Sequence, residues 1–202
     1  MRAFFAVDLD EPARQAASET ARALRGRTGG DLRWVKPERY HVTLRFLGEI
    51  PPESAGDLAA RAGKAVAPVA PFSLRMGAPR AFPSPRRPRV VVLDLEPEEP
   101  LVGLARRLEE AVVAAGLPAE ERPFRAHLSL GRVRGGRLRV PAGAPPPESP
   151  GFPVDAVVLY ESELRPQGSR YTAFARLPLA GGAPPDSDSP STPDEGEIHG
   201  QA

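Results

Sequence analysis

Two short stretches of the chain share one local pattern. They are "YHVTLRFLG" at residues 40–48 and "FRAHLSLGR" at residues 124–132. In each, a histidine is followed by any residue, then by a hydroxyl residue and then by leucine. The chain of 202 residues has only three histidines, and two of them, His41 and His127, lie in this pattern. A single histidine on a strand is more often structural than catalytic, but the repeated setting favours a functional role for both.

Alternation in the strand period indicates how these side chains are presented. Residues two apart in a strand point to the same side. The first stretch therefore predicts a strand with His41, Thr43 and Arg45 on an open face, while the apolar residues between them, Phe46 included, face a core. The second stretch predicts the same arrangement for its histidine and serine. A strand is a rigid support, which suits a catalytic group.

Two imidazoles with adjacent hydroxyls fit the hydrolysis of a phosphodiester. That reaction needs one proton taken from water and one given to the leaving oxygen, and histidine can do either near neutral pH. The hydroxyls of Thr43 and Ser129 can donate hydrogen bonds to phosphate oxygens, and an arginine can neutralise the charge that builds on them.

Composition excludes several other kinds of site. The chain has no cysteine, so disulfides, thiolate nucleophiles and zinc–thiolate sites are ruled out. No cluster of His, Asp and Glu has metal-ligand spacing, and no glycine-rich loop resembles a nucleoside triphosphate site, so we expect no cofactor. The N-terminus does not resemble a signal peptide and no apolar run is long enough to span a membrane, which predicts a cytoplasmic protein.

The order of predicted elements is that of an α+β protein in two rough halves, each with one histidine stretch. The predicted helices lie at 10–26, 51–66 and 99–117, with Asp10 as an N-cap and Gly26 as a stop for the first. The predicted strands lie at 3–9, 31–35, 40–48, 72–78, 88–95, 127–133, 154–162 and 171–179. Residues 141–153 are expected to form a loop.

The last 22 residues differ from the rest of the chain. The segment 181–202 has five acids, no Lys or Arg and almost no large apolar residue, so it cannot offset the entropy of ordering. We expect a disordered acidic tail after a single domain at 1–180. The third histidine, His199, lies in that tail and is expected to be inert. Without the tail, 27 basic residues face 26 − 5 = 21 acids, a modestly basic balance that suits a phosphate-bearing ligand.

The two histidine stretches resemble the paired motifs of the 2H phosphoesterase superfamily, in particular its RNA 2′,3′-cyclic phosphodiesterases, also called 2′-5′ RNA ligases. The resemblance covers about residues 2–179. It includes "RAFFAVDLDEPAR" at the start, "LRWVKPERYHVTLRFLGEI" and "FRAHLSLGRV" around the motifs, and "LYESELRPQGSRYTAFARLPL" near the end. Ser129 is the one departure in the motifs, since threonine is commoner there, but serine keeps the hydroxyl.

The resemblance implies a fold and roles for individual residues. The implied fold is bilobal, with two antiparallel sheets lining a central cleft, helices packed outside and a pseudo-twofold relation between the lobes. The implied reaction opens an RNA 2′,3′-cyclic phosphate to a 2′-phosphate, with His41 as general acid and His127 as general base. Thr43, Ser129 and Arg132 would bind the substrate. Strand parity places Arg132 opposite His127, so it needs a bend at the preceding glycine to reach the site.

Other functions and partners stay open at this point. The same site could join or cleave 2′-5′ linkages, or the protein could be a non-catalytic module that binds RNA ends. Expected ligands are RNAs with 2′,3′-cyclic phosphate ends, such as tRNA fragments, or small cyclic nucleotides; we expect a monomer and no membrane partner. For Trp34, stacking on a nucleobase and packing in the core are equally expected. Tyr40 and Tyr160 are expected to pack. The loop arginines Arg80, Arg86, Arg87 and Arg89 are expected to be solvated, with steering of RNA as the alternative.

Overall fold

The computed structural model describes residues 1–181 apart from 137, 150 and 166–167. The predicted tail therefore lies almost entirely outside the described residues, as does His199. Three α-helices, two short 3₁₀ helices and nine strands follow one another along the described chain. They are β1 (Arg2–Asp8), α1 (Glu11–Leu24), β2 (Asp31–Trp34), η1 (Pro37–Arg39), β3 (His41–Glu49), η2 (Pro52–Ser54), α2 (Ala55–Val66), β4 (Phe72–Phe82), β5 (Val90–Glu96), α3 (Glu99–Ala114), β6 (Leu128–Gly135), β7 (Phe152–Val154), β8 (Ala156–Glu163) and β9 (Arg170–Pro178).

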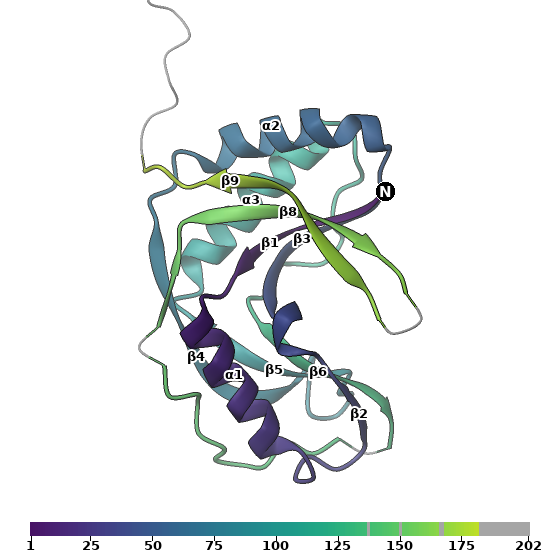
Figure 1. Ribbon diagram of the computed structural model, residues 1–202, viewed down its shortest axis with the longest axis vertical. Coiled ribbons are helices and arrows are strands. Elements are labelled where there is room, and N and C mark those ends of the chain that lie inside the picture. The colour runs from purple at the N-terminus through teal and green to yellow at the C-terminus, as the bar shows by residue number, and fades with distance from the viewer. Residues whose placement is uncertain (137, 150, 166–167, 182–202) are drawn as a thin grey trace, which may run out of the picture.

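The strands form two antiparallel sheets, as expected for an α+β protein of this class (Figure 1). The first sheet has the order β3-β1-β8-β9, and the second has the order β2-β6-β5-β4-β7. The two histidine stretches therefore lie in different sheets, on β3 and at the start of β6. These two strands nevertheless contact each other where the sheets meet.

Each sheet is covered by a helix that follows a strand of the other sheet. Helix α1 follows β1 of the first sheet, but it packs against β6 of the second sheet and against the 3₁₀ helix η1. Helix α3 follows β5 of the second sheet, but it packs against β3 and against α2, which itself covers β9. The chain therefore crosses between the two sheets, and helices and strands of each sheet are interleaved along the sequence.

Local signals for the first helix are confirmed. The side chain of Asp10 accepts a hydrogen bond from the main-chain N–H of Ala13 at 2.9 Å, which is the interaction of an N-cap. The helix ends at Leu24, and Gly26 follows with a φ of +78°, a conformation that glycine adopts without steric cost.

Three predicted boundaries were wrong. Strand β4 runs on to Phe82, so Arg80 lies on a strand and not in a loop. Residues 152–154, whose first two fall in the segment predicted as a loop, form β7 and pair with β4. Helix α2 begins at Ala55 because the 3₁₀ turn η2 precedes it; Pro51 is the N-cap of this turn and Pro52 its first residue, where missing N–H groups cost nothing.

A β-bulge interrupts each histidine strand at the same place. On β3, Thr43 is opposite Ala6 and Arg45 is opposite Phe5, so Leu44 is an extra residue. On β6, Ser129 and Gly131 are opposite consecutive residues of β5, so Leu130 is an extra residue. A bulge places two residues against one and re-aims the side chains that follow. Both bulges fall three residues after the histidine, and they decide which side chains join it.

Within the described residues, no helix combines the length and the apolar character needed to cross a membrane.

Candidate functional site

The two histidines are oriented by the same hydrogen bond. Nδ1 of His41 lies 2.8 Å from the main-chain oxygen of Arg39, and Nδ1 of His127 lies 2.8 Å from that of Arg125. A carbonyl oxygen only accepts, so Nδ1 carries the hydrogen in both rings and donates it. In the neutral form the other ring nitrogen, Nε2, is therefore the basic one. No partner for either Nε2 is found among the described residues, so both are available for proton transfer.

The structure brings the two imidazoles and one guanidinium into electrostatic range of each other. Burial lowers the pKa of His41, and the positive charges of Arg132 and His127 lower it further. Burial also lowers the pKa of His127, with additional lowering by Arg80 and Arg132. Both rings are therefore biased towards the neutral form until a negative charge arrives. A phosphate near the two rings would supply that charge.

Each histidine has an aspartate beside it on the neighbouring strand. Asp8 of β1 is directly opposite His41. On the other sheet, Leu93 of β5 pairs with Leu128 of β6, so the next residue of β5, Asp94, lies beside the residue before Leu128, which is His127. Each carboxylate raises the pKa of its histidine, against the effect of burial. The separation along the chain is the same in both halves, because 41 − 8 and 127 − 94 are both 33.

The two aspartates differ in their partners. The hydroxyl of Tyr160 donates to both carboxylate oxygens of Asp8, at 2.8 and 3.0 Å, and leaves the negative charge uncompensated. Arg80 forms an ion pair with Asp94, with 2.5 Å between Nε and Oδ1. The guanidinium offsets the carboxylate charge, so His127 receives less support for its protonated form than His41 does.

The bulge at Leu44 places Arg45 and Phe46 on the faces opposite to those that strict alternation predicted. Phe46 is opposite Phe4 and Thr43 is opposite Ala6, so Phe46 lies on the face of Thr43 and His41. Its side chain is 55% exposed, although a core position was expected. The rings of Phe4 and Phe46 lie 5.9 Å apart, so Phe46 extends the aromatic wall beside His41.

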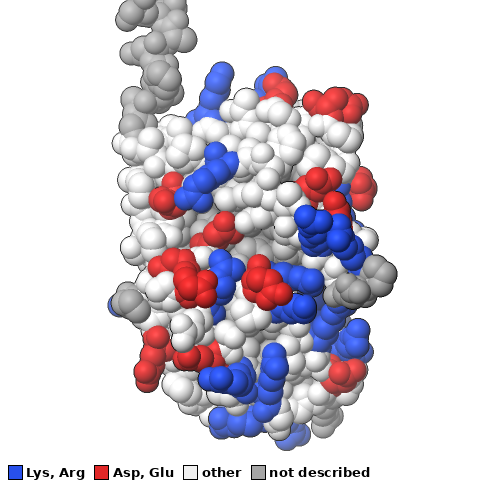
Figure 2. All heavy atoms as spheres, viewed as in Figure 1, with Lys and Arg blue, Asp and Glu red and all other residues white. Residues whose placement is uncertain are grey.

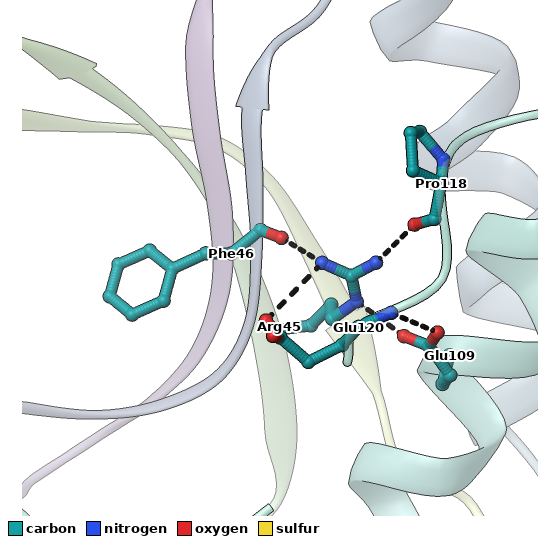
Figure 3. Close-up of polar contacts among 5 residues, drawn as sticks. All are labelled: Arg45, Phe46, Glu109, Pro118 and Glu120. Atoms are coloured by element: carbon teal, nitrogen blue, oxygen red, sulfur yellow. Dashed lines mark hydrogen bonds and ion pairs between the residues drawn. The ribbon is translucent and has the colours of Figure 1, made fainter. Parts of the chain in front are cut away.

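Arg45 takes the buried position that was expected for Phe46 (Figure 3). Its guanidinium bonds the carboxylate of Glu109 on α3 and the main-chain oxygen of Phe46, and it donates to the oxygen of Pro118 at 2.6 Å. Glu120 completes the group, because its carboxylate lies 3.8 Å from the guanidinium and its N–H donates to Glu109 at 2.8 Å. Arg45 is thus a structural residue that links the bulge in β3 to α3 and to the segment that leads to the second motif.

The bulge at Leu130 has the opposite consequence, since it brings a predicted residue into the site. Arg132 is opposite Val90 on β5, and Ser129 is opposite Val92, two positions away. Opposite residues share a face, so Arg132 lies on the face of Ser129 and His127. A bulge therefore turns Arg132 to the face of His127, as the sequence-based prediction required. It lies at Leu130, one residue before Gly131, where the bend was expected.

Aromatic rings fix the planes of the two imidazoles. His41 packs against Phe4, with 4.9 Å between centroids, and meets Tyr171 edge-on at 5.2 Å. His127 stacks on Phe82 at 4.8 Å, and Arg80 lies over the same phenyl ring at 5.3 Å. A hollow of about 820 Å³ is lined by residues that include Arg75, Arg80, Asp94, Arg125 and Ala126, the last two of which directly precede His127 in the sequence.

The remaining candidates have structural explanations. Trp34 pairs with Gly131 and packs partly buried against the core, on the face of β2 opposite that of Arg33, so it is a packing residue. Tyr40 is buried, as expected, and Tyr160 is half-buried and bonded to Asp8. The side chains of Arg86, Arg87 and Arg89 are exposed. Among the described residues, no group of three or more His, Asp and Glu is placed to hold a metal ion.

Sequence reasoning missed the two aspartates, although a signal was present. Asp8 and Asp94 are single carboxylates inside apolar strands, in "FFAVDL" and "VVVLDL". A charge within a buried strand is costly unless it has a partner. Each of these aspartates also lies 33 positions before a histidine of the repeated pattern, and this equal spacing was the signal that could have identified both.

Comparison with known proteins agrees with this architecture. Residues 7–92 match the family model of LigT-like phosphoesterases. An RNA 2′,3′-cyclic phosphodiesterase of Thermus thermophilus is 35% identical over 190 residues, which cover 90% of this chain and 91% of the relative. The crystal structure of a Thermus thermophilus protein superimposes with a TM-score of 0.78 at 33% identity, covering 91% of this chain and all of that one.

A further solved structure contains a bound nucleotide. Escherichia coli LigT in complex with 3′-AMP superimposes with a TM-score of 0.71 at 29% identity, covering 88% of this chain and 97% of that one. The similarity in sequence and fold extends over nearly the whole described chain. The chain belongs to the LigT-like phosphoesterases, a family within the 2H phosphoesterase superfamily.

Proposed function

We propose that this protein hydrolyses RNA 2′,3′-cyclic phosphate ends to 2′-phosphates, with His41 as general acid and His127 as general base. The names of its relatives support the substrate class. The observation that carries the mechanism is the matched pair of hydrogen bonds that presents Nε2 of both rings. A general acid and a general base each need one free nitrogen, held in a fixed orientation near the reacting atoms.

In the proposed reaction, Nε2 of His127 takes a proton from water as the water oxygen attacks the phosphorus. The bond between phosphorus and O3′ breaks, and Nε2–H of His41 gives its proton to O3′. The product has a 2′-phosphate and a 3′-hydroxyl. The hydroxyls of Thr43 and Ser129 donate to the non-bridging oxygens, and Arg132 stabilises the negative charge that grows on them.

The aspartates beside the two histidines support this assignment of the acid and the base. Asp8 is bonded by the neutral hydroxyl of Tyr160, and it raises the pKa of His41, which favours the protonated form that an acid needs. Asp94 is paired with Arg80, so His127 has a stronger bias towards the neutral form that a base needs. Two titratable groups whose environments separate their pKa values are typical of an acid and base pair.

A direct assay tests the proposal. A short RNA with a 2′,3′-cyclic phosphate should be converted to the 2′-phosphate, with equal rates in buffer and in EDTA, because the proposed acid and base are both histidine side chains. His41→Ala and His127→Ala should each reduce turnover at least ~10²-fold. A 3′-phosphate product or full turnover in both variants would exclude the mechanism. Joining of a 5′-hydroxyl RNA in place of hydrolysis would indicate a ligase, and binding with no turnover would indicate an RNA-end-binding module.

A further inference from the structure

Arg33 of β2 and Arg39 of η1 meet the hairpin of the first sheet at one point. Gly168, in the hairpin between β8 and β9, has a φ of +112°. A Cβ added to it would lie under 3.0 Å from the guanidinium nitrogens of both Arg33 and Arg39. The two guanidinium groups therefore lie next to each other. Their mutual repulsion is unfavourable unless a negative charge lies between them.

A third arginine continues this row towards the histidines. Arg33 of β2 is directly opposite Arg132 of β6, so the two side chains share one face of the sheet. Like charges in directly opposite positions destabilise a strand pair. The charge of Arg132 reaches both imidazoles, and the main-chain oxygen of Arg39 orients His41. The row Arg132, Arg33 and Arg39 therefore leads outward from the histidines.

Carboxylates do not neutralise this row in the described part of the chain. No ion pair involves Arg33, Arg39 or Arg132 there, whereas Lys36 and Arg165 nearby pair with Glu38 and Glu163. Figure 2 shows Lys and Arg side chains, with Asp and Glu side chains among them, along the edge of the molecule that contains the hairpin and β2. A surface that leaves arginines unpaired while neighbouring bases are paired is suited to an external anion.

We propose that Arg33 and Arg39 form a second phosphate site, which binds the phosphodiester immediately 5′ of the terminal nucleotide of the RNA. This inference rests on the proposed function, because it takes the cyclic phosphate to lie between the histidines. The planar guanidinium is suited to bidentate recognition of a phosphate. The site would make the enzyme selective for RNA ends over cyclic mononucleotides, since only an RNA has the second phosphate.

The test compares two substrates that differ by that phosphate. kcat/KM is measured for a dinucleotide with a 2′,3′-cyclic phosphate and for the corresponding cyclic mononucleotide. In the double variant Arg33→Ala/Arg39→Ala, kcat/KM for the dinucleotide should fall about 10- to 100-fold, the scale for charge-assisted contacts, with the mononucleotide unchanged. The salt dependence of the dinucleotide reaction should weaken at the same time.

Matched controls separate this site from general charge effects. Arg22→Ala/Arg106→Ala removes two exposed arginines from the outer helices and should leave both substrates unchanged. Arg33→Ala alone, at an exposed position, should give part of the loss if the double variant is poorly folded. Equal losses on both substrates, or no loss on either, would overturn the second phosphate site. Failure of the wild-type protein to turn over either substrate would instead contradict the proposed function.

Discussion

His41 and His127 lie in different sheets, yet each donates Nδ1–H to the carbonyl oxygen two residues earlier, at the same distance of 2.8 Å. Each is also followed, three residues later, by the extra leucine of a bulge. The two half-sites are therefore built alike in backbone and in ring orientation. They differ in charge, because one aspartate is bonded by a tyrosine and the other by an arginine.

The first prediction concerns the pH dependence of catalysis. Burial lowers the pKa of both histidines in the free enzyme, and kcat/KM reports the free enzyme. The bell-shaped profile of kcat/KM should therefore have its maximum below pH 6.5, the ordinary pKa of histidine. A bound phosphate raises both pKa values, so the maximum of kcat should lie at higher pH. A kcat/KM maximum above pH 7 would contradict the burial argument.

The second prediction assigns the two limbs of that profile. If His41 is the acid, Asp8→Asn removes the charge that supports its protonated form and should move the alkaline limb to lower pH. Asp94→Asn should move the acidic limb to lower pH, because it leaves Arg80 uncompensated near His127. Tyr160→Phe is the matched control for Asp8, since it removes the hydrogen bond and retains the carboxylate. Shifts of the opposite limbs would exchange the two roles.

The third prediction concerns stability and pH. A histidine whose folded pKa is below its unfolded value binds fewer protons in the folded state, so it contributes stability above about pH 6.5 that is lost as the pH falls towards the folded pKa. The free energy of unfolding, from urea titrations, should thus decrease between pH 7 and pH 5. The double variant His41→Asn/His127→Asn should show a shallower decrease. An equally steep decrease would assign the effect to other groups.

The fourth prediction concerns Arg45. Its removal leaves Glu109 without its charged partner at the junction of β3 and α3. Because Glu109 is partly exposed, we expect Arg45→Met to lower the free energy of unfolding by about 2 kcal/mol, less than for a fully buried pair. Glu109→Gln in the same chain should restore part of the loss. Arg61→Met, in an exposed pair with Asp57, should change the free energy of unfolding much less. A similar cost at both arginines would argue against the buried network.

The limits of sequence reasoning are clear at particular residues. Alternation correctly grouped His41 with Thr43, because they precede the bulge, and it failed at Arg45 and Phe46, because they follow it. A bulge depends on pairing with a partner strand, which a local period does not contain. The same effect explains why Arg132 looked misplaced on its strand.

Non-local pairing also hid the rest of the site. Each aspartate is 33 positions from its histidine in the sequence, and the two residues are brought together only by the pairing of their strands. The meeting of Arg33 and Arg39 with Gly168 requires the hairpin of one sheet to reach the other. In contrast, the cap at Asp10 and the end of α1 depend on nearby residues and were predicted correctly.

The central claim, that His41 is the acid and His127 the base, is tested most directly by changing the leaving group. A phosphodiester such as bis(p-nitrophenyl) phosphate releases a stable anion that needs little protonation, so it bypasses the acid and still requires the base. On a cyclic-phosphate RNA both alanine variants should lose at least ~10²-fold in turnover. On the activated ester His41→Ala should come within about tenfold of the wild type, while His127→Ala should stay impaired by at least ~10²-fold. Rescue of His127→Ala in place of His41→Ala would reverse the roles, and equal losses of both variants on both substrates would show that the histidines bind phosphate without transferring protons.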